Sequence, residues 1–228
     1  MKLAIIPARS GSKRIKNKNI TKVHGKPIIY YVIKKLLKSK IFDKVVVSTD
    51  SDKIIKLSKI YGAEAPFKRP KNLSDDKTRA SSVVKHTINY YKRKKIEFKY
   101  VCCVYPTSIL LNTDNIKKAL TLLERNKEKK YVITITKYKH PLERALTYEK
   151  KIIKPIFPKK IKERTQDLKV YYHDAAQFYL GRSFSFENDI EPISKSSIPL
   201  IIDSSRVLDI DEYNDLELLE KIKLNYII

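Results

Sequence analysis

Short apolar runs alternate with longer amphipathic segments along the first part of the chain. The apolar runs cover residues 3–7, 45–48, 100–105 and 131–136. Their short length and β-branched content predict buried strands. The amphipathic segments between them cover residues 28–37, 51–61, 80–91 and 114–125, and they predict helices. Strands that alternate with helices predict an α/β fold with a parallel sheet covered on both faces.

The segment 28–37 shows the helical period most clearly. Ile29, Val32, Ile33 and Leu36 lie at spacings of 3, 4 and 7 residues from the first, which places them on one helical face. Helix N-caps are expected at Ser51 and Asp114. In a sheet of this class ligands bind outside the carboxyl ends of the strands, so the loops after the predicted strands are the candidate site.

The alternation ends after residue 136. Residues 138–174 carry little periodicity and hold three X-Pro pairs, at 140–141, 154–155 and 157–158, so they are interpreted as an inserted lobe. Strands are expected again at 175–180 and 198–202, and a final helix at 212–224. The whole chain, 1–228, is expected to form one domain that contains this lobe.

Length and composition indicate a globular protein. The chain has 228 residues, of which 42% are hydrophobic, and no apolar run reaches the roughly 18 residues of a membrane span. The uncharged stretch 3–8 is shorter than the core of about 7–15 residues of a signal peptide, so a cytoplasmic location is expected. Cys102 and Cys103 would point to opposite faces of a strand, which favours two small buried hydrophobes over a disulfide or metal site.

The net charge is +24, from 49 basic and 25 acidic residues, and such an excess first suggests nucleic acid. The lysines are spread along the whole chain, without an RNA-binding aromatic signature or zinc-finger spacing. The excess is interpreted as mainly a solvated surface from which a small anionic ligand gains. No nucleic-acid partner is expected, and a basic nucleic-acid-binding protein is kept as the alternative of a different class.

The loop after the first predicted strand carries the richest candidate chemistry. Residues 7–19 read Pro-Ala-Arg-Ser-Gly-Ser-Lys-Arg-Ile-Lys-Asn-Lys-Asn, with a glycine that lets the backbone approach a ligand and cations that can neutralise a triphosphate. The loop fits neither the Walker pattern G-x-x-x-x-G-K-[ST] nor G-x-G-x-x-G, so no motif supports an ATPase or dinucleotide site. A merely solvated basic loop is the alternative interpretation.

This loop resembles the signature A-R-G-G-S-K-R-x-x-x-K-N of the acylneuraminate cytidylyltransferase family. Here it stands as Ala8 to Arg14, followed by Lys18-Asn19. Ser10 stands where the family has glycine, which is tolerated unless the position needs a positive φ. Further pieces follow in order: Gly25-Lys26-Pro27, Val47-Ser48-Thr49-Asp50, Tyr61-Gly62-Ala63-Glu64, Arg69-Pro70, Leu73, Asp76, Pro106-Thr107-Ser108 and Asp209-Ile210-Asp211.

The resemblance implies a Rossmann-like nucleotide-diphospho-sugar transferase fold, with a mainly parallel sheet and a small inserted dimerisation lobe. It implies a homodimer in which the lobe reaches over the partner's active site, CTP as the nucleotide and Mg²⁺ as the cofactor. Arg9, Ser12 and Lys18 would hold the phosphates, and Asn19 and Arg69 the cytidine. The full nucleotide-binding set implied is Arg9, Ser12, Lys13, Lys18, Asn19, Arg69 and Thr78.

Asp209 and Asp211 are the candidate metal ligands. In an extended segment two carboxylates at this spacing face the same side, while Ile210 points into the core. That geometry suits one hydrated Mg²⁺ on phosphate oxygens, and the resemblance favours it. The alternative from the residues alone is that Asp211 caps the last helix, and Asp215 is interpreted as a surface helix residue. The catalytic set implied is Arg9, Lys18, Asp209 and Asp211.

Two segments bear on the acceptor sugar. Residues 105–111 read Tyr-Pro-Thr-Ser-Ile-Leu-Leu where sialic acid enzymes typically have Q-P-T-S-P-L-R, which argues against sialic acid. Residues 172–179, and also 140–145, resemble the enzymes that act on pseudaminic acid. Either Arg144 or Arg164 suits a carboxylate, and a structural histidine is the alternative for His173. The sugar-binding set expected is Thr107, Ser108, Arg144, Arg164, Gln166, His173 and Gln177.

The expected reaction is one in-line displacement at the α-phosphate of CTP by the anomeric hydroxyl of a carboxylate sugar, with release of pyrophosphate. Arg9 and Lys18 would stabilise the added negative charge, and the general base is left open between a metal-bound hydroxide and a carboxylate. Pseudaminic acid is the favoured acceptor. The same reaction on N-acylneuraminic, legionaminic or a ketodeoxy-octulosonic acid is the nearest alternative.

Overall fold

The computed structural model describes residues 1–227, and a six-stranded sheet forms its centre, in the order β10-β6-β9-β5-β1-β4. Neighbouring strands run parallel except at β9, which lies antiparallel to both β5 and β6. Each of the six predicted strands is present, and the predicted mainly parallel sheet is confirmed. The strands are β1 Lys2–Pro7, β4 Lys44–Ser48, β5 Tyr100–Val104, β6 Tyr131–Lys137, β9 Tyr172–Arg182 and β10 Ser197–Ile201.

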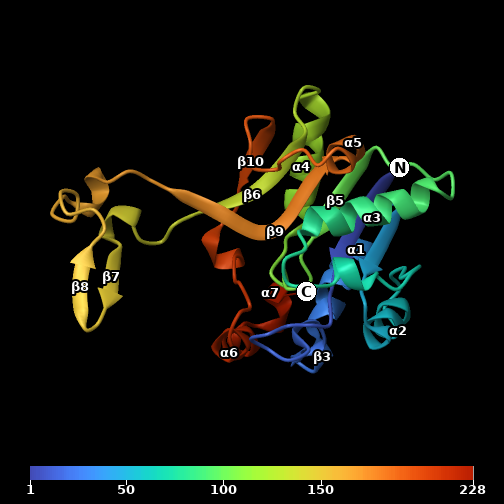
Figure 1. Cartoon of the computed structure of the whole chain (residues 1–228), viewed down its shortest axis with the longest axis horizontal. Coiled ribbons are helices and arrows are strands. Elements are labelled where there is room, and N and C mark those ends of the chain that lie inside the picture. The colour runs from blue at the N-terminus through green and yellow to red at the C-terminus, as the bar shows by residue number, and fades with distance from the viewer. Residues whose placement is uncertain (228) are drawn as a thin grey trace.

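Helices cover both faces of this sheet (Figure 1). On one face α1 (Ile28–Ser39), α2 (Asp52–Ile60) and α4 (Thr113–Arg125) share a hydrophobic cluster with the strands. On the other face the cluster is formed with α3 (Ala80–Lys92) and α5 (Ser183–Glu187). Side chains that alternate along β1, β4, β5, β6 and β9 supply both clusters, whereas β10 contributes only to the first.

The two cysteines follow the same alternation. Cys102 belongs to the cluster under α1 and Cys103 to the cluster under α3, and both are buried free thiols. The prediction that they point to opposite faces is confirmed. Within residues 1–227, no helix has both the length and the apolar character needed to cross a bilayer.

Local side-chain bonds set the helix ends. The Ser51 hydroxyl accepts the Ile54 N–H at the start of α2, as predicted. The N-cap of α4 is Asn112 and not Asp114, because the Asn112 side chain accepts the Asp114 N–H at 2.9 Å. The predicted last helix is divided into α6 (Tyr213–Lys221) and α7 (Leu224–Ile227).

A third hydrophobic cluster joins the first loop to the C-terminal segment. It packs Ile15 of the loop against Ile28 of α1, Ile109 of the loop after β5, and Ile210. Ile210 is buried as predicted, so this cluster fixes the flanking carboxylates next to the first loop. Two short strands, β2 (Lys22–Val23) and β3 (Lys26–Pro27), pair next to this cluster. The 3₁₀ helices of the chain are Lys18–Ile20, Lys71–Leu73, Leu142–Arg144, Thr165–Asp167 and Ser204–Arg206.

Residues 138–171 of the predicted lobe stand apart from the sheet at the left of Figure 1, whereas residues 172–174, which were predicted as part of it, begin strand β9. The lobe contains an antiparallel hairpin that the sequence did not predict, β7 (Leu146–Glu149) and β8 (Ile152–Pro155). The hairpin turn places Lys150 and Lys151 at φ values of 50° and 65°, where Asn or Gly is the usual signal. Apolar side chains of the lobe are exposed to solvent: Leu146, Tyr148, Ile152, Ile153, Ile156 and Phe157.

Candidate active site

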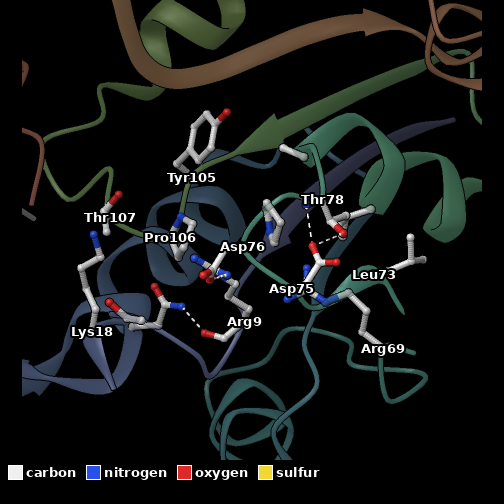
Figure 2. Close-up of a pocket in the computed structure, with 15 residues that line it drawn as sticks. Arg9, Lys18, Arg69, Leu73, Asp75, Asp76, Thr78, Tyr105, Pro106 and Thr107 are labelled. Atoms are coloured by element: carbon white, nitrogen blue, oxygen red, sulfur yellow. Dashed lines mark hydrogen bonds and ion pairs between the residues drawn. The ribbon is translucent and has the colours of Figure 1, made fainter. Parts of the chain in front are cut away.

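A cavity of about 370 Å³ opens at the carboxyl end of β1, where ligands bind in sheets of this class. Figure 2 shows Lys18 and Thr107 on one side of it and Arg69, Asp75 and Thr78 on the other, with Arg9 between them. The sequence-predicted residues that line this cavity are Arg9, Ser12, Lys18, Asn19, Arg69, Thr78 and Thr107. The structure therefore brings together residues from three loops that are far apart in the sequence.

One carboxylate holds two cations of the first loop. Asp76 pairs with both the guanidinium of Arg9 and the ammonium of Lys13, and these bonds, the Lys13 bond foremost, lower the pKa of Asp76. Lys13 is largely exposed and lies outside the cavity lining. Asp76 was part of the sequence motif but had no predicted role. The structure identifies it as the counter-charge that orients the loop.

Arg69 is a buried cation in the cavity wall, only 5% exposed. Its Nε and Nη2 atoms have no hydrogen-bond partner within residues 1–227. Burial lowers the pKa of the guanidinium, and the nearby Asp50 carboxylate acts in the opposite direction. Because an unpaired buried charge is unfavourable by itself, this arrangement is better explained by a ligand than by stability.

The first loop is tied to the end of β4 through Asp50. The Asp50 carboxylate accepts the Ser10 N–H at 2.8 Å and the Ser10 hydroxyl at 2.7 Å. Partial burial opposes ionisation of Asp50, but the bonds from Ser10 outweigh it and the pKa of Asp50 is lowered. Ser10 does not adopt a positive φ. The serine is therefore tolerated at the glycine position of the motif, and its hydroxyl makes a bond that glycine lacks.

Asp211 is bound by two other cations of the first loop. Its carboxylate lies 2.6 Å from Arg14 Nη2 and 3.3 Å from Lys18 Nζ, and Lys18 also donates to the Ile210 carbonyl. Two predicted catalytic residues, 193 positions apart, are thus in contact. No role for Arg14 was predicted beyond its charge.

Asp211 does not cap the last helix, which corrects the alternative interpretation. The N-cap of α6 is Glu212. Asp215 accepts the N–H groups of both Asp211 and Glu212 at 2.7 Å, so it is not the plain surface residue that the sequence indicated. This capping arrangement leaves the Asp211 side chain directed to the first loop.

Asp209 forms no ion pair within residues 1–227. Partial desolvation raises its pKa, and the carboxylates of Asp211 and Asp174 add to the effect. Like charges held this close are relieved by a divalent cation, and carboxylate oxygens are ligands that Mg²⁺ prefers. The described part of the chain holds no group of three or more metal-ligating side chains. Two carboxylates at this spacing could serve one hydrated Mg²⁺, whose other ligands would come from phosphates and water.

Two of the predicted acceptor residues are buried beside the cavity. The Ser108 hydroxyl donates to the Gln177 carbonyl at 3.1 Å, and the Gln177 amide donates to the Arg206 carbonyl. Neither residue lines the cavity, whereas Thr107 next to them does. The Ser108 hydroxyl is therefore committed to holding the loop after β5 against β9.

The other predicted acceptor residues lie in or beside the lobe, and none of them lines the cavity. The Arg144 guanidinium donates to the carbonyls of Ile161 at 2.6 Å and Glu163 at 2.5 Å, so it braces the lobe itself. Arg164 and Gln166 are exposed. His173 is half-buried, with Nδ1 2.9 Å from the Asp174 carbonyl and its ring against Tyr138.

Sequence comparisons cover nearly the whole chain. The model of a family described as cytidylyltransferase matches residues 3–226. A pseudaminic acid cytidylyltransferase of Campylobacter jejuni is 40% identical over 216 residues, which are 94% of this chain and 93% of the relative. A CMP-N,N'-diacetyllegionaminic acid synthase of Legionella pneumophila is 29% identical over 227 residues, covering 96% and 95% of the two chains.

Comparison with solved structures supports the fold. The structure of a CMP:2-keto-3-deoxy-manno-octonic acid synthetase complexed with CTP superposes with a TM-score of 0.71 at 14% identity, covering 96% of each chain. A 4-diphosphocytidyl-2C-methyl-D-erythritol synthase of Anaerococcus prevotii gives 0.58 at 12% identity, with the same coverage. The predicted nucleotidyltransferase fold is confirmed.

Proposed function

The chain belongs to the cytidylyltransferase family and is a nucleotidyltransferase, and on that premise we propose that it transfers CMP from CTP to the anomeric hydroxyl of pseudaminic acid. The observation that carries this proposal is the cavity at the end of β1, where Arg9, Lys18 and the unpartnered guanidinium of Arg69 converge. The choice of acceptor is supported by the similarity to the Campylobacter jejuni enzyme along almost the whole chain.

The phosphates would be bound by the cations of the first loop. Asp76 holds Arg9 and Lys13 in place, and a triphosphate would take over these ion pairs because it carries more negative charge. The cytidine would lie toward Asn19, whose side chain donates to the Arg9 carbonyl at 2.8 Å, and Arg69. The loop is thus oriented before the nucleotide arrives, which reduces the entropy lost on binding.

The reaction needs positioning and charge stabilisation more than covalent chemistry from the protein. The sugar oxygen forms a bond to the α-phosphorus, the bond from phosphorus to the β-phosphate bridging oxygen breaks, and pyrophosphate leaves with the electron pair. The hydroxyl proton passes to a general base, for which a carboxylate of the site is one candidate, and a bound Mg²⁺ would supply the other by making a water more acidic. Lys18 and Arg9 would stabilise the charge that develops on the α-phosphate oxygens.

Asp209 and Asp211 would hold Mg²⁺, which when bound would offset the charge of the phosphates. The protein prepares this segment in two ways. Buried Ile210 fixes the backbone between the two carboxylates. Arg14 and Lys18 orient Asp211, and Asp215 bonds its N–H group.

We also propose that the chain acts as a homodimer through the lobe. The lobe exposes a set of apolar side chains, and Arg164 and Gln166 lie outside the cavity of their own chain. A second copy packed on the lobe would bury the apolar side chains and place these polar residues near the partner's acceptor site. A cytoplasmic location, where CTP is available, goes with this proposal.

The test is pyrophosphate release from CTP and Mg²⁺ with a panel of acids: pseudaminic, N-acetylneuraminic, legionaminic and ketodeoxy-octulosonic. Release with pseudaminic acid is expected. Release with another acid alone would keep the transfer reaction and contradict the acceptor. CTP binding without release from any acid would contradict the acceptor class.

The alternative of a nucleic-acid-binding protein is tested by salt. Binding to a polyanion should collapse between about 50 and 200 mM salt, whereas a specific CTP site should persist.

A further inference from the structure

A second cavity, of about 380 Å³, lies between α1, α4, the 3₁₀ turn Ser204–Arg206 and α7. It shares no lining residue with the nucleotide cavity. Four cations line it, together with hydroxyl and amide side chains: Lys35, Lys38, Lys117 and Arg206, with Ser39, Asn112, Thr113, Asn225 and Tyr226. We propose that this cavity binds a small phosphate-bearing anion.

Lys35 is half-buried in the wall of this cavity. Its ammonium donates to the carbonyls of Ile109 and Leu111, both at 2.7 Å, and an ammonium has a third N–H to offer. Burial lowers the pKa of Lys35 to about 8, and the positive charge of Arg206 adds to the effect. Two cations are therefore held close enough to repel each other, and an anion between them would relieve that repulsion.

Arg206 is held in a fixed orientation. Its guanidinium carbon lies 4.2 Å from the centre of the Tyr226 ring, in a cation–π contact. Neither Arg206 nor Lys38 forms an ion pair anywhere in the described chain, residues 1–227. An oriented guanidinium without a carboxylate presents the fork of donors that matches a phosphate group.

Two carboxylates on the elements around the cavity have other partners. Asp114 pairs with Lys117 at 3.0 Å. Asp203 accepts the Ser205 N–H at 2.8 Å. The positive charge of Arg206 helps to lower the pKa of Asp203, but the two side chains form no ion pair within residues 1–227. Among residues 1–227 the lining therefore carries the positive charges of Lys35, Lys38 and Arg206 and no carboxylate, and the volume leaves room for the organic part of a phosphate ester.

Equilibrium dialysis with labelled inorganic phosphate tests the proposal. The cavity variant is Lys38→Glu with Arg206→Glu. Its matched control is Lys53→Glu with Lys56→Glu on α2, which changes the charge equally and touches neither cavity. Wild type and control should bind the same number of phosphates per chain, and the cavity variant one fewer. Equal numbers in all three proteins would overturn the proposal, because any phosphate in the nucleotide cavity is common to them.

The milder pair Lys38→Ala and Arg206→Ala covers the case in which the charge-reversed chain does not fold. Its dissociation constant for phosphate should rise about tenfold or more, since bonds to charged groups are lost. An unchanged constant would reject the site. Unlabelled pyrophosphate or glycerol phosphate should displace the label that the cavity variant lacks, which would support the site and show which of the two compounds binds there more tightly. Displacement by chloride at equal ionic strength would contradict it.

Discussion

The nucleotide cavity and the lobe are constructed in opposite ways. The cavity is formed by loops that leave buried strands, and carboxylates from distant segments (Asp50, Asp76 and Asp211) hold its basic loop in place. The lobe contains a two-stranded hairpin, stands away from the sheet and exposes apolar side chains. Contacts within one chain therefore hold the cavity that we propose as the nucleotide site, whereas the lobe presents a surface suited to a second molecule.

Asp211→Ala is expected to have the largest effect at the cavity. Loss of the carboxylate that contacts Arg14 and Lys18, and that would hold Mg²⁺, should lower kcat by about 10²–10³-fold in pyrophosphate release. Asp203→Ala, in an exposed turn of the same region, is the control and should retain turnover. Near-normal turnover of Asp211→Ala would remove this residue from the catalytic set.

Arg69→Met should separate ligand binding from stability. The dissociation constant for CTP should rise about 10–100-fold, because hydrogen bonds to a charged group contribute about 1.5–3 kcal/mol. The melting temperature should stay equal or rise, since an unpaired buried charge is removed. Calorimetry gives both quantities. A destabilised variant with normal CTP binding would show that Arg69 serves the fold, and Arg79→Met on the surface is the control.

Ser10→Ala measures how much the hydrogen bond from the Ser10 hydroxyl to Asp50 contributes to CTP binding. Loss of one hydroxyl bond should weaken CTP binding about 2–10-fold, from the 0.5–1.5 kcal/mol of a typical hydrogen bond. Ser10→Gly should have a similar effect, because it keeps the backbone N–H bond and loses the same hydroxyl. If either variant bound CTP as the wild type does, the hydroxyl would have no part in orienting the loop.

Substitutions in the lobe are expected to have the smallest effect on CTP binding. Tyr148→Ser with Ile153→Ser should change the free energy of unfolding of the single chain by only about 0.5 kcal/mol, because both side chains are exposed. CTP binding should be unchanged, while sedimentation should show dissociation and KM for the acceptor should rise. Ile60→Ser on α2 is the matched control. An unchanged oligomeric state would contradict the assignment of the lobe as the dimer surface.

The strands were predictable because burial on both faces produces apolar runs such as those of β1 and β5. The place of β9 was not, since an antiparallel strand inserted between β5 and β6 depends on partners far away in the sequence. The hairpin was missed because lysines occupy the turn positions that Asn or Gly usually marks.

The basic loop was predictable in the same way, because residue types in a fixed order carried the motif. Arg9, Lys18 and Asn19 do line the cavity, and their roles with CTP stay predictions. The Arg144 guanidinium bonds two backbone carbonyls of the lobe, which its charge alone did not indicate, and its role with the acceptor carboxylate stays a prediction. Carboxylates such as Asp76 neutralise part of the positive charge of the first loop. Only one feature of the sequence could have predicted their role, namely that so many neighbouring cations require counter-charges.

The lobe begins and ends on neighbouring strands. Lys137 of β6 pairs with Tyr172 of β9, and the Tyr138 N–H donates to the Tyr171 carbonyl at 3.0 Å. The sheet thus closes the base of the segment, and changes in the length or sequence beyond that base leave the strands in register. The lobe is in this sense a separate insertion whose two ends are fixed by the sheet. A graft joined at Lys137 and Tyr172 would exchange the hairpin end of the chain and leave the loops that line the cavity at the end of β1 in place.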